Sequence, residues 1–148
     1  QELYSQAILG ERGIEAYDRF LHGLLNVKDG EAVLWHCTQG KDRTGIAAIL
    51  VEYVLGASLE NMRKDYLATN ISVDGWLENM AKTFGNVSMP LGINKAIEAY
   101  AYASTCYFDY AMKMFNDIFG SLDSYIEKTL HFTKEEQEQL RSMYLERS

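Results

Sequence analysis

Apolar side chains recur at helical spacing along most of this chain. Over residues 14–27 they fall three and four positions apart, which predicts an amphipathic helix, and Lys-Asp-Gly at 28–30 predicts the turn that ends it. The apolar run over residues 45–55 predicts a buried helix that stops at Gly56. Most of the methionines and tyrosines lie at such helical spacing, so we expect them to pack in the core.

The same periodicity predicts further helices after Gly56. They cover residues 58–69, with Ser58 as the N-cap, and residues 73–84, 94–119 and 122–130. The segment 85–93 holds the single proline and is predicted to be a loop. Thr133, with Glu136 three residues later, forms a capping box that opens a last amphipathic helix.

One short segment has the pattern of a strand. Residues 32–35 (Ala-Val-Leu-Trp) are a continuous apolar run after a turn, which is typical of a strand buried in a parallel sheet. A strand needs neighbours to pair with, and the chain offers no second clear strand. We therefore expect an α/β fold, in which residues 1–148 are the C-terminal, mostly helical part of a single domain and the missing strands precede Gln1.

The predicted strand runs directly into the segment His-Cys-Thr-Gln-Gly-Lys-Asp-Arg-Thr-Gly at 36–45. Between a strand and a helix, such a loop can curl so that successive backbone N–H groups point inward and hold a phosphoryl group. The same field would stabilise a thiolate at Cys37, and Arg43 offers a planar fork for two phosphate oxygens. A phosphate-binding loop around an ionised cysteine predicts a nucleophilic phosphatase site.

The remaining loop residues have narrower predicted roles. His36 would be a buried ring that hydrogen-bonds to the backbone, and this bond would help to orient the loop and tune Cys37. Thr44 either only caps the following helix or also donates to the Cys37 sulfur and eases its departure. Lys41 either adds positive charge at the pocket rim or is simply solvated. The predicted phosphate-binding set is Thr38, Gln39, Gly40, Lys41, Asp42 and Arg43.

Other interpretations of the loop fail on its residues. A Walker A loop would need glycine where Trp35 stands and Ser or Thr where Asp42 stands. A metal site would need more ligands than the adjacent pair His36 and Cys37, which would point in different directions. We therefore expect neither a metal nor another cofactor.

Composition and charge narrow the class of protein. Of the 148 residues, 47% are hydrophobic and 24% are charged, as is typical of a globular domain, and no apolar run approaches the length of a membrane span. The formal net charge of −7 argues against nucleic acid as a partner. Two cysteines are too few for a disulfide framework, and we expect Cys106 to be a small buried side chain.

At residues 36–45 the sequence resembles the bacterial tyrosine phosphatases with the signature His-Cys-x-x-Gly-Lys-Asp-Arg-Thr-Gly. That group includes secreted phosphatases of pathogens that act on phosphotyrosine and on phosphoinositides. Residues 65–70 (Asp-Tyr-Leu-Ala-Thr-Asn) are similar to the group's Asp-Tyr-Leu-x-x-Asn segment. Residues 119–126, 133–136 and 140–141 are similar to the C-terminal ending of that group. The resemblance therefore covers the chain from about Glu11 onward.

The resemblance implies a phosphatase fold with a central parallel sheet flanked by helices. It implies Cys37 as the nucleophile, Arg43 as the phosphate-binding arginine, and Lys41 with Asp42 as the group's Lys-Asp pair. Leaving-group protonation also needs an acid. Asp42 is the favoured candidate, since it lies in the loop and the group is thought to use this position; alternatively it only braces the loop amides.

The sequence thus predicts an enzyme that hydrolyses phosphate monoesters through a phosphocysteine at Cys37, with phosphotyrosine proteins or phosphoinositides as substrates. One alternative is an inositol-polyphosphate phosphatase, which is disfavoured because Lys41 is the only additional basic residue within the loop. Another is a non-catalytic phosphoryl-binding module, because the domain is expected to be incomplete. A cytoplasmic and a secreted location both stay open, since the expected missing N-terminus would hold any signal peptide.

Overall fold

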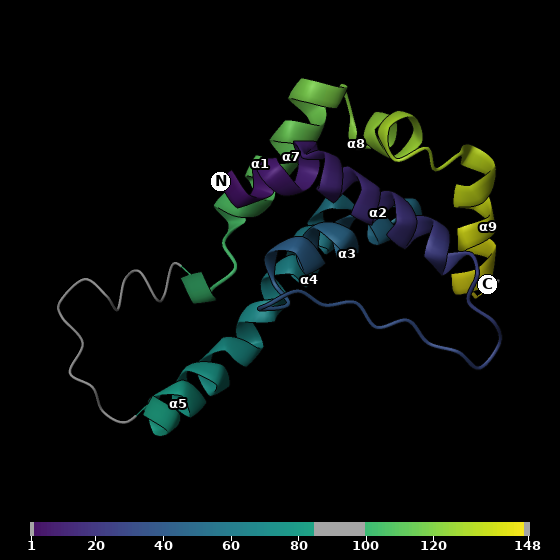
Figure 1. Cartoon of the computed structure of the whole chain (residues 1–148). Helices are drawn as coiled ribbons and strands as arrows, with labels where there is room; N and C mark the ends of the chain where they lie inside the picture. Colours follow the sequence, from purple (N-terminus) through teal and green to yellow (C-terminus); the bar gives the residue numbers. More distant parts are fainter. Residues whose placement is uncertain (1, 85–99, 147–148) are drawn as a thin grey trace.

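The computed structural model describes residues 2–84 and 100–146, and for residues 80–84 the backbone alone. Every regular element within these residues is helical (Figure 1). In chain order they are α1 (Glu2–Leu9), α2 (Glu11–Leu24), α3 (Asp42–Val54), α4 (Leu59–Ala68), the 3-10 turn η1 (Thr69–Ser72), α5 (Val73–Phe84), α7 (Thr105–Phe119), α8 (Leu122–Ser124), the π-helical turn η2 (Tyr125–Thr129) and α9 (Lys134–Tyr144).

The predicted α/β fold with a strand at 32–35 is wrong for the described residues, which contain no strand. An extended segment becomes a strand only by pairing with another, and no second extended partner lies beside this one in the described part of the chain. Its side chains are not buried either, since Val33 is 41% and Leu34 89% exposed. The apolar run alone therefore did not predict the pairing and burial that a strand needs.

Trp35 anchors this extended segment at its C-terminal end. The indole ring packs against Phe20 of α2, with the ring centroids 5.2 Å apart. Its Nε1 donates to the backbone oxygen of Thr44 in α3 at 3.4 Å. Trp35 thereby fixes the chain between two helices immediately before Cys37.

Most of the predicted helices are confirmed. The helix predicted over 14–27 is α2, the helix after the loop is α3, and α4 begins after Ser58, whose hydroxyl accepts from the Asn61 N–H at 3.2 Å. The helix over 73–84 is α5, the segment 122–130 forms the helical turns α8 and η2, and the capping box of Thr133 and Glu136 opens α9. The loop predicted at 85–93 lies outside the described residues.

Two helical assignments needed correction. The long helix predicted over 94–119 is interrupted: residues 100–101 are helical, residues 102–104 are not, and α7 begins at Thr105, where the Ser104 hydroxyl caps the Cys106 N–H. Residues 94–99 of that prediction lie outside the described part. The first helix, α1, was not predicted, yet Tyr4 and Ile8 on it are almost fully buried.

The core forms where α1, α2, α4 and α9 pack around α3, and α7 packs against α1 and α4. Ile46, Ile49 and Leu50 of α3 lie at its centre and are at most 1% exposed. The guanidinium of Arg141, on α9, donates to the Val54 carbonyl at the end of α3 at 2.6 Å, which satisfies one of the helix's free acceptors. The helix that follows the cysteine loop is therefore held along its whole length.

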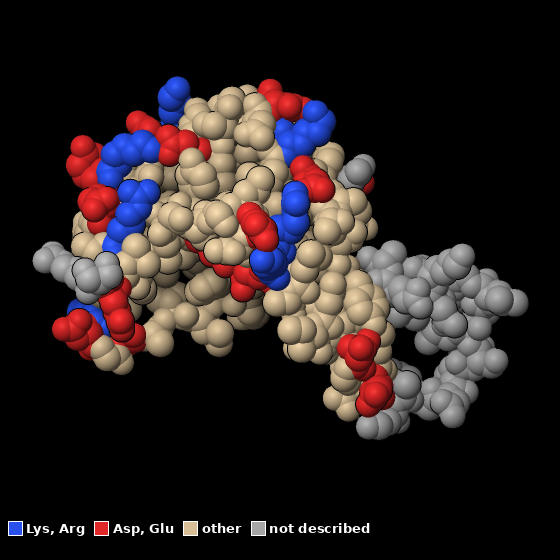
Figure 2. Space-filling model, turned by 180° about the vertical axis from the view of Figure 1, so that it is seen from behind, with Lys and Arg blue, Asp and Glu red and all other residues tan. Residues whose placement is uncertain are grey.

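Helix α5 projects from this body, away from α9 (Figure 1). On the face seen in Figure 2, basic and acidic groups are interspersed over the body, without a broad basic field. The exposed carboxylates Asp74 and Glu78 lie on α5. Among the described residues no helix is both long and apolar enough to cross a bilayer.

Candidate active site

Cys37 lies at the wall of a cavity of about 500 Å³ between α1, α2 and the start of α3. His36, Arg43 and Thr44 line the same cavity, so the structure brings four of the predicted catalytic residues together. The opposite walls are mostly apolar and come from α1 and α2; they include Leu3, Ala7, Ala16, Tyr17 and Phe20. The predicted cysteine is thus accessible from a pocket and only partly buried.

Hydrogen-bond donors converge on the sulfur of Cys37. Burial alone would raise the pKa of this thiol, but the Thr44 hydroxyl and the backbone N–H groups of Thr44, Gln39 and Gly40 outweigh burial and lower the pKa to about 6. Three amides directed at one sulfur are the inward-pointing arrangement that the sequence predicted for the loop. At neutral pH the group is therefore a thiolate, which is the nucleophilic form of cysteine.

Gly40 and Thr44 are suited to these positions. Gly40 has a φ of +69°, which residues with a side chain rarely adopt, and its N–H is one of the donors that lower the pKa of Cys37. Apart from its contribution at Cys37, the buried Thr44 Oγ1 has no hydrogen-bond partner in the described part of the chain. Its proton is therefore free to turn toward the thiolate of Cys37.

Arg43 is exposed at the start of α3, where its guanidinium donates to the Thr38 hydroxyl at 3.3 Å. Its backbone carbonyl accepts from the hydroxyl of buried Tyr17 at 3.3 Å, which fixes the first turn of α3 on α2. A side chain held only by one neutral hydroxyl keeps most of its donors available for an anion in the cavity.

His36 lies differently from the expectation. Its ring is exposed, and Nδ1 lies 3.3 Å from the backbone oxygen of the adjacent Cys37. The predicted backbone contact is present, but the contact is local and links the ring to no other part of the loop.

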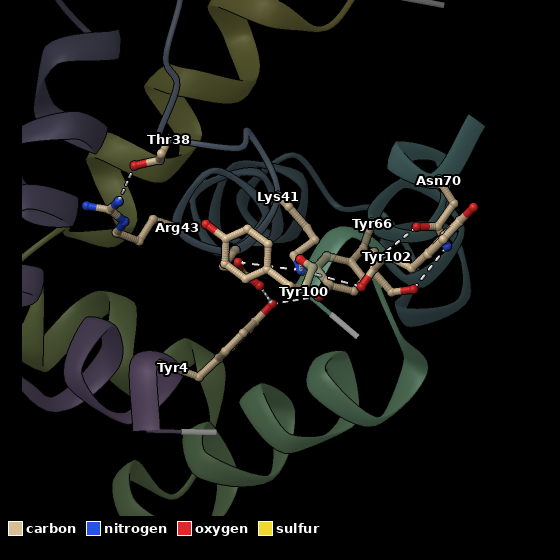
Figure 3. Close-up of polar contacts among 10 residues, drawn as sticks. Tyr4, Thr38, Lys41, Arg43, Tyr66, Asn70, Tyr100 and Tyr102 are labelled. Carbon is tan, nitrogen blue, oxygen red and sulfur yellow. Dashed lines mark hydrogen bonds and ion pairs between the residues drawn. The ribbon is translucent and has the colours of Figure 1, made fainter. Parts of the chain in front are cut away.

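Lys41 is not solvated at the rim of the Cys37 cavity. It is 4% exposed, and its ammonium group donates to the carbonyls of Tyr100 at 2.5 Å and Tyr102 at 3.4 Å. Figure 3 shows the side chains of Lys41 and Arg43 pointing in different directions, Lys41 toward Tyr100 and Arg43 toward Thr38. Lys41 therefore ties the loop to residues 100–102.

Asp42 is held on the same side as Lys41. One carboxylate oxygen accepts from the Tyr4 hydroxyl at 2.8 Å, and the other lies 3.8 Å from the Lys41 ammonium. The Tyr4 and Tyr66 hydroxyls lie 2.6 Å apart (Figure 3). Since the Tyr4 proton is directed at Asp42, Tyr66 is the donor between the two hydroxyls. Asp42 is not among the residues that line the Cys37 cavity.

The other predicted phosphate-binding residues divide between cavities. Thr38 and Gln39 border a second cavity of about 370 Å³ next to η1 and α5. Gly40 borders a third, of about 290 Å³, together with Gly45 and Tyr66. The backbone amides of Gln39 and Gly40 nonetheless point back to Cys37, so these residues contribute to the site through the main chain.

A family model described as the tyrosine phosphatase family matches residues 1–146. The chain belongs to this family. A protein of Cupriavidus necator named "Putative tyrosine-protein phosphatase" is 28% identical over 139 residues, which cover 93% of this chain and 48% of that protein. The chain therefore spans about half the length of this relative.

The segment 65–70, singled out by its resemblance to tyrosine phosphatases, has defined contacts. Tyr66 joins Tyr4 as described above, and its ring lies where a side chain on Gly45 would stand, 2.9 Å from an added Cβ. The Asn70 side chain both accepts from the Ala103 N–H at 2.7 Å and donates to the Ala103 carbonyl at 3.0 Å. The segment thus supports the cysteine loop of this tyrosine-phosphatase-family chain from behind.

Sequence reasoning missed Tyr4, Tyr17 and Arg12 at this site. Tyr17 belongs to a predicted apolar stripe, so its spacing predicts burial, whereas Tyr4 lies on α1, which was not predicted. Neither position gives a sign that its hydroxyl reaches Arg43 or Asp42. Arg12 lines the Cys37 cavity, and nothing in its local sequence distinguishes it from other exposed arginines. A conserved contact across elements is the kind of signal that one sequence does not carry.

The second cysteine, Cys106, does not line the Cys37 cavity. Cys106 is exposed, so its predicted burial is wrong; it lies in the first turn of α7, where its sulfur is 3.2 Å from the Ser104 hydroxyl. Within residues 2–84 and 100–146, no cluster of three His, Cys, Asp or Glu side chains could hold a metal ion.

Proposed function

We propose that this chain hydrolyses phosphate monoesters of tyrosine through nucleophilic attack by Cys37. The observation that carries the proposal is the convergence of the Gln39, Gly40 and Thr44 amides and the Thr44 hydroxyl on the Cys37 sulfur. Donors that stabilise a thiolate also suit a phosphoryl group placed beside it, because both are anions. Membership of the tyrosine phosphatase family supports the same chemistry.

In the proposed reaction, the Cys37 thiolate attacks phosphorus while the bond between phosphorus and the ester oxygen breaks. The ester oxygen leaves with the bonding electrons and takes a proton from solvent. Arg43 turns from Thr38 to two phosphate oxygens and stabilises the charge that spreads over them. Water then attacks phosphorus and the bond between phosphorus and sulfur breaks, which releases inorganic phosphate. The Thr44 hydroxyl donates a hydrogen bond to the departing sulfur, which leaves as a thiolate.

For Asp42 the contacts support the bracing role. Its carboxylate already accepts from Tyr4 and lies near the Lys41 ammonium, and it does not line the Cys37 cavity. A brace in this position fixes residues 41–43, which carry the backbone into α3. Lys41 has a similar role through the Tyr100 and Tyr102 carbonyls, so we assign it to loop anchoring rather than to direct phosphate contact.

The aromatic lining of the cavity supports phosphotyrosine as the substrate. The walls contributed by Tyr17, Phe20 and Trp35 are aromatic, and offset or edge contacts with a substrate ring would contribute to its binding. A polyphosphorylated inositol ring would instead need several cations around the phosphate loop. Because Lys41 is buried and bound to carbonyls, the cavity offers few cations.

The test compares hydrolysis of phosphotyrosine and of a simple aryl phosphate by the wild-type chain, Cys37→Ser and Cys106→Ser. We expect Cys37→Ser to lose at least ~10³-fold in kcat, because the hydroxyl is a far weaker nucleophile. Cys106→Ser, the matched control, keeps the wild-type rate, since its sulfur lies on α7 outside the cavity. Equal rates in all three proteins, or phosphate binding by the wild type without any turnover, would overturn the proposal.

A further inference from the structure

Arg12 is a second arginine on the cavity that holds Cys37 and Arg43. It lies near the start of α2, and Gly13 of the same helix and Gln6 of α1 line the same cavity. Its side chain is exposed. A cation at this place is not required for packing, because the aliphatic and aromatic side chains of α1 and α2 already form the core beneath it.

Arg12 has no partner within the described part of the chain. Neither Glu11 nor Glu15, its neighbours on α2, forms an ion pair with it, although nearby charged residues elsewhere on the helix do pair: His22 lies 2.9 Å from Asp18. An exposed arginine beside acidic neighbours commonly pairs with one of them at (i, i+3) or (i, i+4) spacing. The five N–H donors of Arg12 are therefore all available at the cavity.

Among the described residues that line the cavity, Arg12 and Arg43 are the ones with a permanent positive charge. Arg43 is assigned to the phosphoryl group, and Lys41, the other cation of the loop, is buried against the carbonyls of Tyr100 and Tyr102. One unpaired guanidinium matches one further carboxylate or phosphate, and not the several phosphates of a polyphosphoinositide headgroup. The overall net charge of −7 makes such a local cation the main attraction for an acidic substrate.

We propose that Arg12 binds an acidic side chain next to the phosphotyrosine, so that the preferred substrates are phosphotyrosine peptides with Asp or Glu beside the phosphorylated residue. This inference rests on the proposed function and adds a specificity subsite to it. The ring of the substrate's phosphotyrosine would lie against Tyr17 and Phe20, with its phosphate directed toward Cys37. The peptide backbone would then pass the mouth of the cavity, where Arg12 pairs with the neighbouring carboxylate.

The experiment measures kcat/KM for two phosphotyrosine peptides that differ only in the residues flanking the phosphotyrosine, Glu in one and Gln in the other. The proteins are the wild-type chain, Arg12→Gln, Arg12→Lys and Arg19→Gln. Arg19 is the matched control, since it is an exposed arginine on the same helix that does not line the cavity. Binding of both peptides to the Cys37→Ser chain, with and without Arg12→Gln, gives the same comparison without turnover.

We expect the wild type to prefer the Glu peptide by about 5- to 20-fold, mostly through KM, and Arg12→Gln to abolish the preference. Arg12→Lys should keep part of it and Arg19→Gln all of it. Equal kcat/KM values of the wild type for the two peptides, or the same loss of preference in Arg19→Gln, would overturn the subsite while leaving the proposed function intact. If Arg12→Gln instead lowers kcat/KM for a free inositol phosphate, Arg12 serves another substrate class and the acidic-peptide subsite is wrong. Failure of every protein to hydrolyse either peptide would count against the proposed function itself, and the binding comparison would then decide the subsite.

Discussion

The Tyr4 hydroxyl donates to the carboxylate of Asp42 across 38 residues of sequence, at 2.8 Å. This bond joins the first helix of the chain to the first turn of the helix that follows the cysteine loop. Burial is the main reason that the pKa of the Tyr4 hydroxyl is raised, and its bonds to Tyr66 and Asp42 add to that, so Tyr4 stays protonated and remains a donor. The position of Asp42 therefore depends on a residue far from the loop.

The role of Asp42 is tested by its dependence on the leaving group. If Asp42 braces the loop, Asp42→Asn should lower kcat/KM for phosphotyrosine and for an activated aryl phosphate by similar factors, within about threefold of each other. A general acid behaves differently, because its loss slows poor leaving groups by ~10²–10⁴-fold and spares good ones. A strong selective loss for phosphotyrosine would contradict the bracing role and return Asp42 to acid catalysis.

Tyr4→Phe gives an independent test of the same brace. The substitution removes the hydroxyl that contacts Asp42 and leaves the buried Tyr66 hydroxyl without its acceptor. We expect a loss of about 1–2 kcal/mol in the free energy of unfolding, together with a uniform fall in activity across leaving groups. Tyr144→Phe is the control, since its hydroxyl bonds to the Leu24 carbonyl far from the loop. A Tyr4→Phe protein with wild-type activity would mean that the bond does not position the site.

The thiolate at Cys37 predicts a specific pH dependence. Its pKa of about 6 lies below the ordinary value for cysteine, so the rate of alkylation by iodoacetamide should rise with pH, reach half its plateau near pH 6 and change little above pH 7. Thr44→Val removes a donor to the sulfur and should move this midpoint to higher pH. Cys106 serves as the internal comparison. A midpoint that Thr44→Val leaves unchanged would exclude the hydroxyl as a cause.

Alanine substitutions at Gly45 and Gly23 distinguish the cost of a steric clash from the gain in helix propensity. A Cβ at Gly45 would lie 2.9 Å from the Tyr66 ring, so Gly45→Ala must displace the ring that supports Tyr4. We expect a loss of about 1–3 kcal/mol in the free energy of unfolding and reduced activity. Gly23→Ala is the matched control on α2, where an added Cβ meets nothing within 4 Å. There alanine should stabilise the helix by about 0.5–1 kcal/mol. Thermal unfolding of both variants measures the contrast, and a stabilised Gly45→Ala would contradict it.

Glu52, on α3, predicts a pH effect on stability. Burial, and then the neighbouring carboxylate of Asp65, raise its pKa to about 7. The folded state therefore holds a proton that the unfolded state has lost, so this contribution to stability is complete below about pH 4.5 and disappears as the pH rises through 7. Relative to the wild type, Glu52→Gln should gain Tm at pH 8 and gain little at pH 5. An equal change at both values would contradict the shifted pKa.

The helices and the cysteine loop were predictable from the sequence because their signals are local. Periodicity located α2, α3 and α5, and capping residues located α4 and α9. The spacing of Cys37 and Arg43 pointed to the candidate site, whose two side chains line one cavity. The environment of residues 32–35 was not predictable, since pairing depends on neighbours and not on the apolar run itself. For the same reason the burial of Lys41, the exposure of Cys106 and the reach of Tyr4 to Asp42 are properties of tertiary contacts.

The central claim is that Cys37 is the nucleophile, and trapping the intermediate tests it most directly. The wild-type chain is mixed with a phosphotyrosine peptide, quenched within milliseconds in denaturant, digested and examined by mass spectrometry. We predict a phosphoryl group on the peptide that contains Cys37, present in the wild type and Cys106→Ser and absent from Cys37→Ser. A phosphoryl group on any other residue, or hydrolysis at the wild-type rate by Cys37→Ser, would contradict the account.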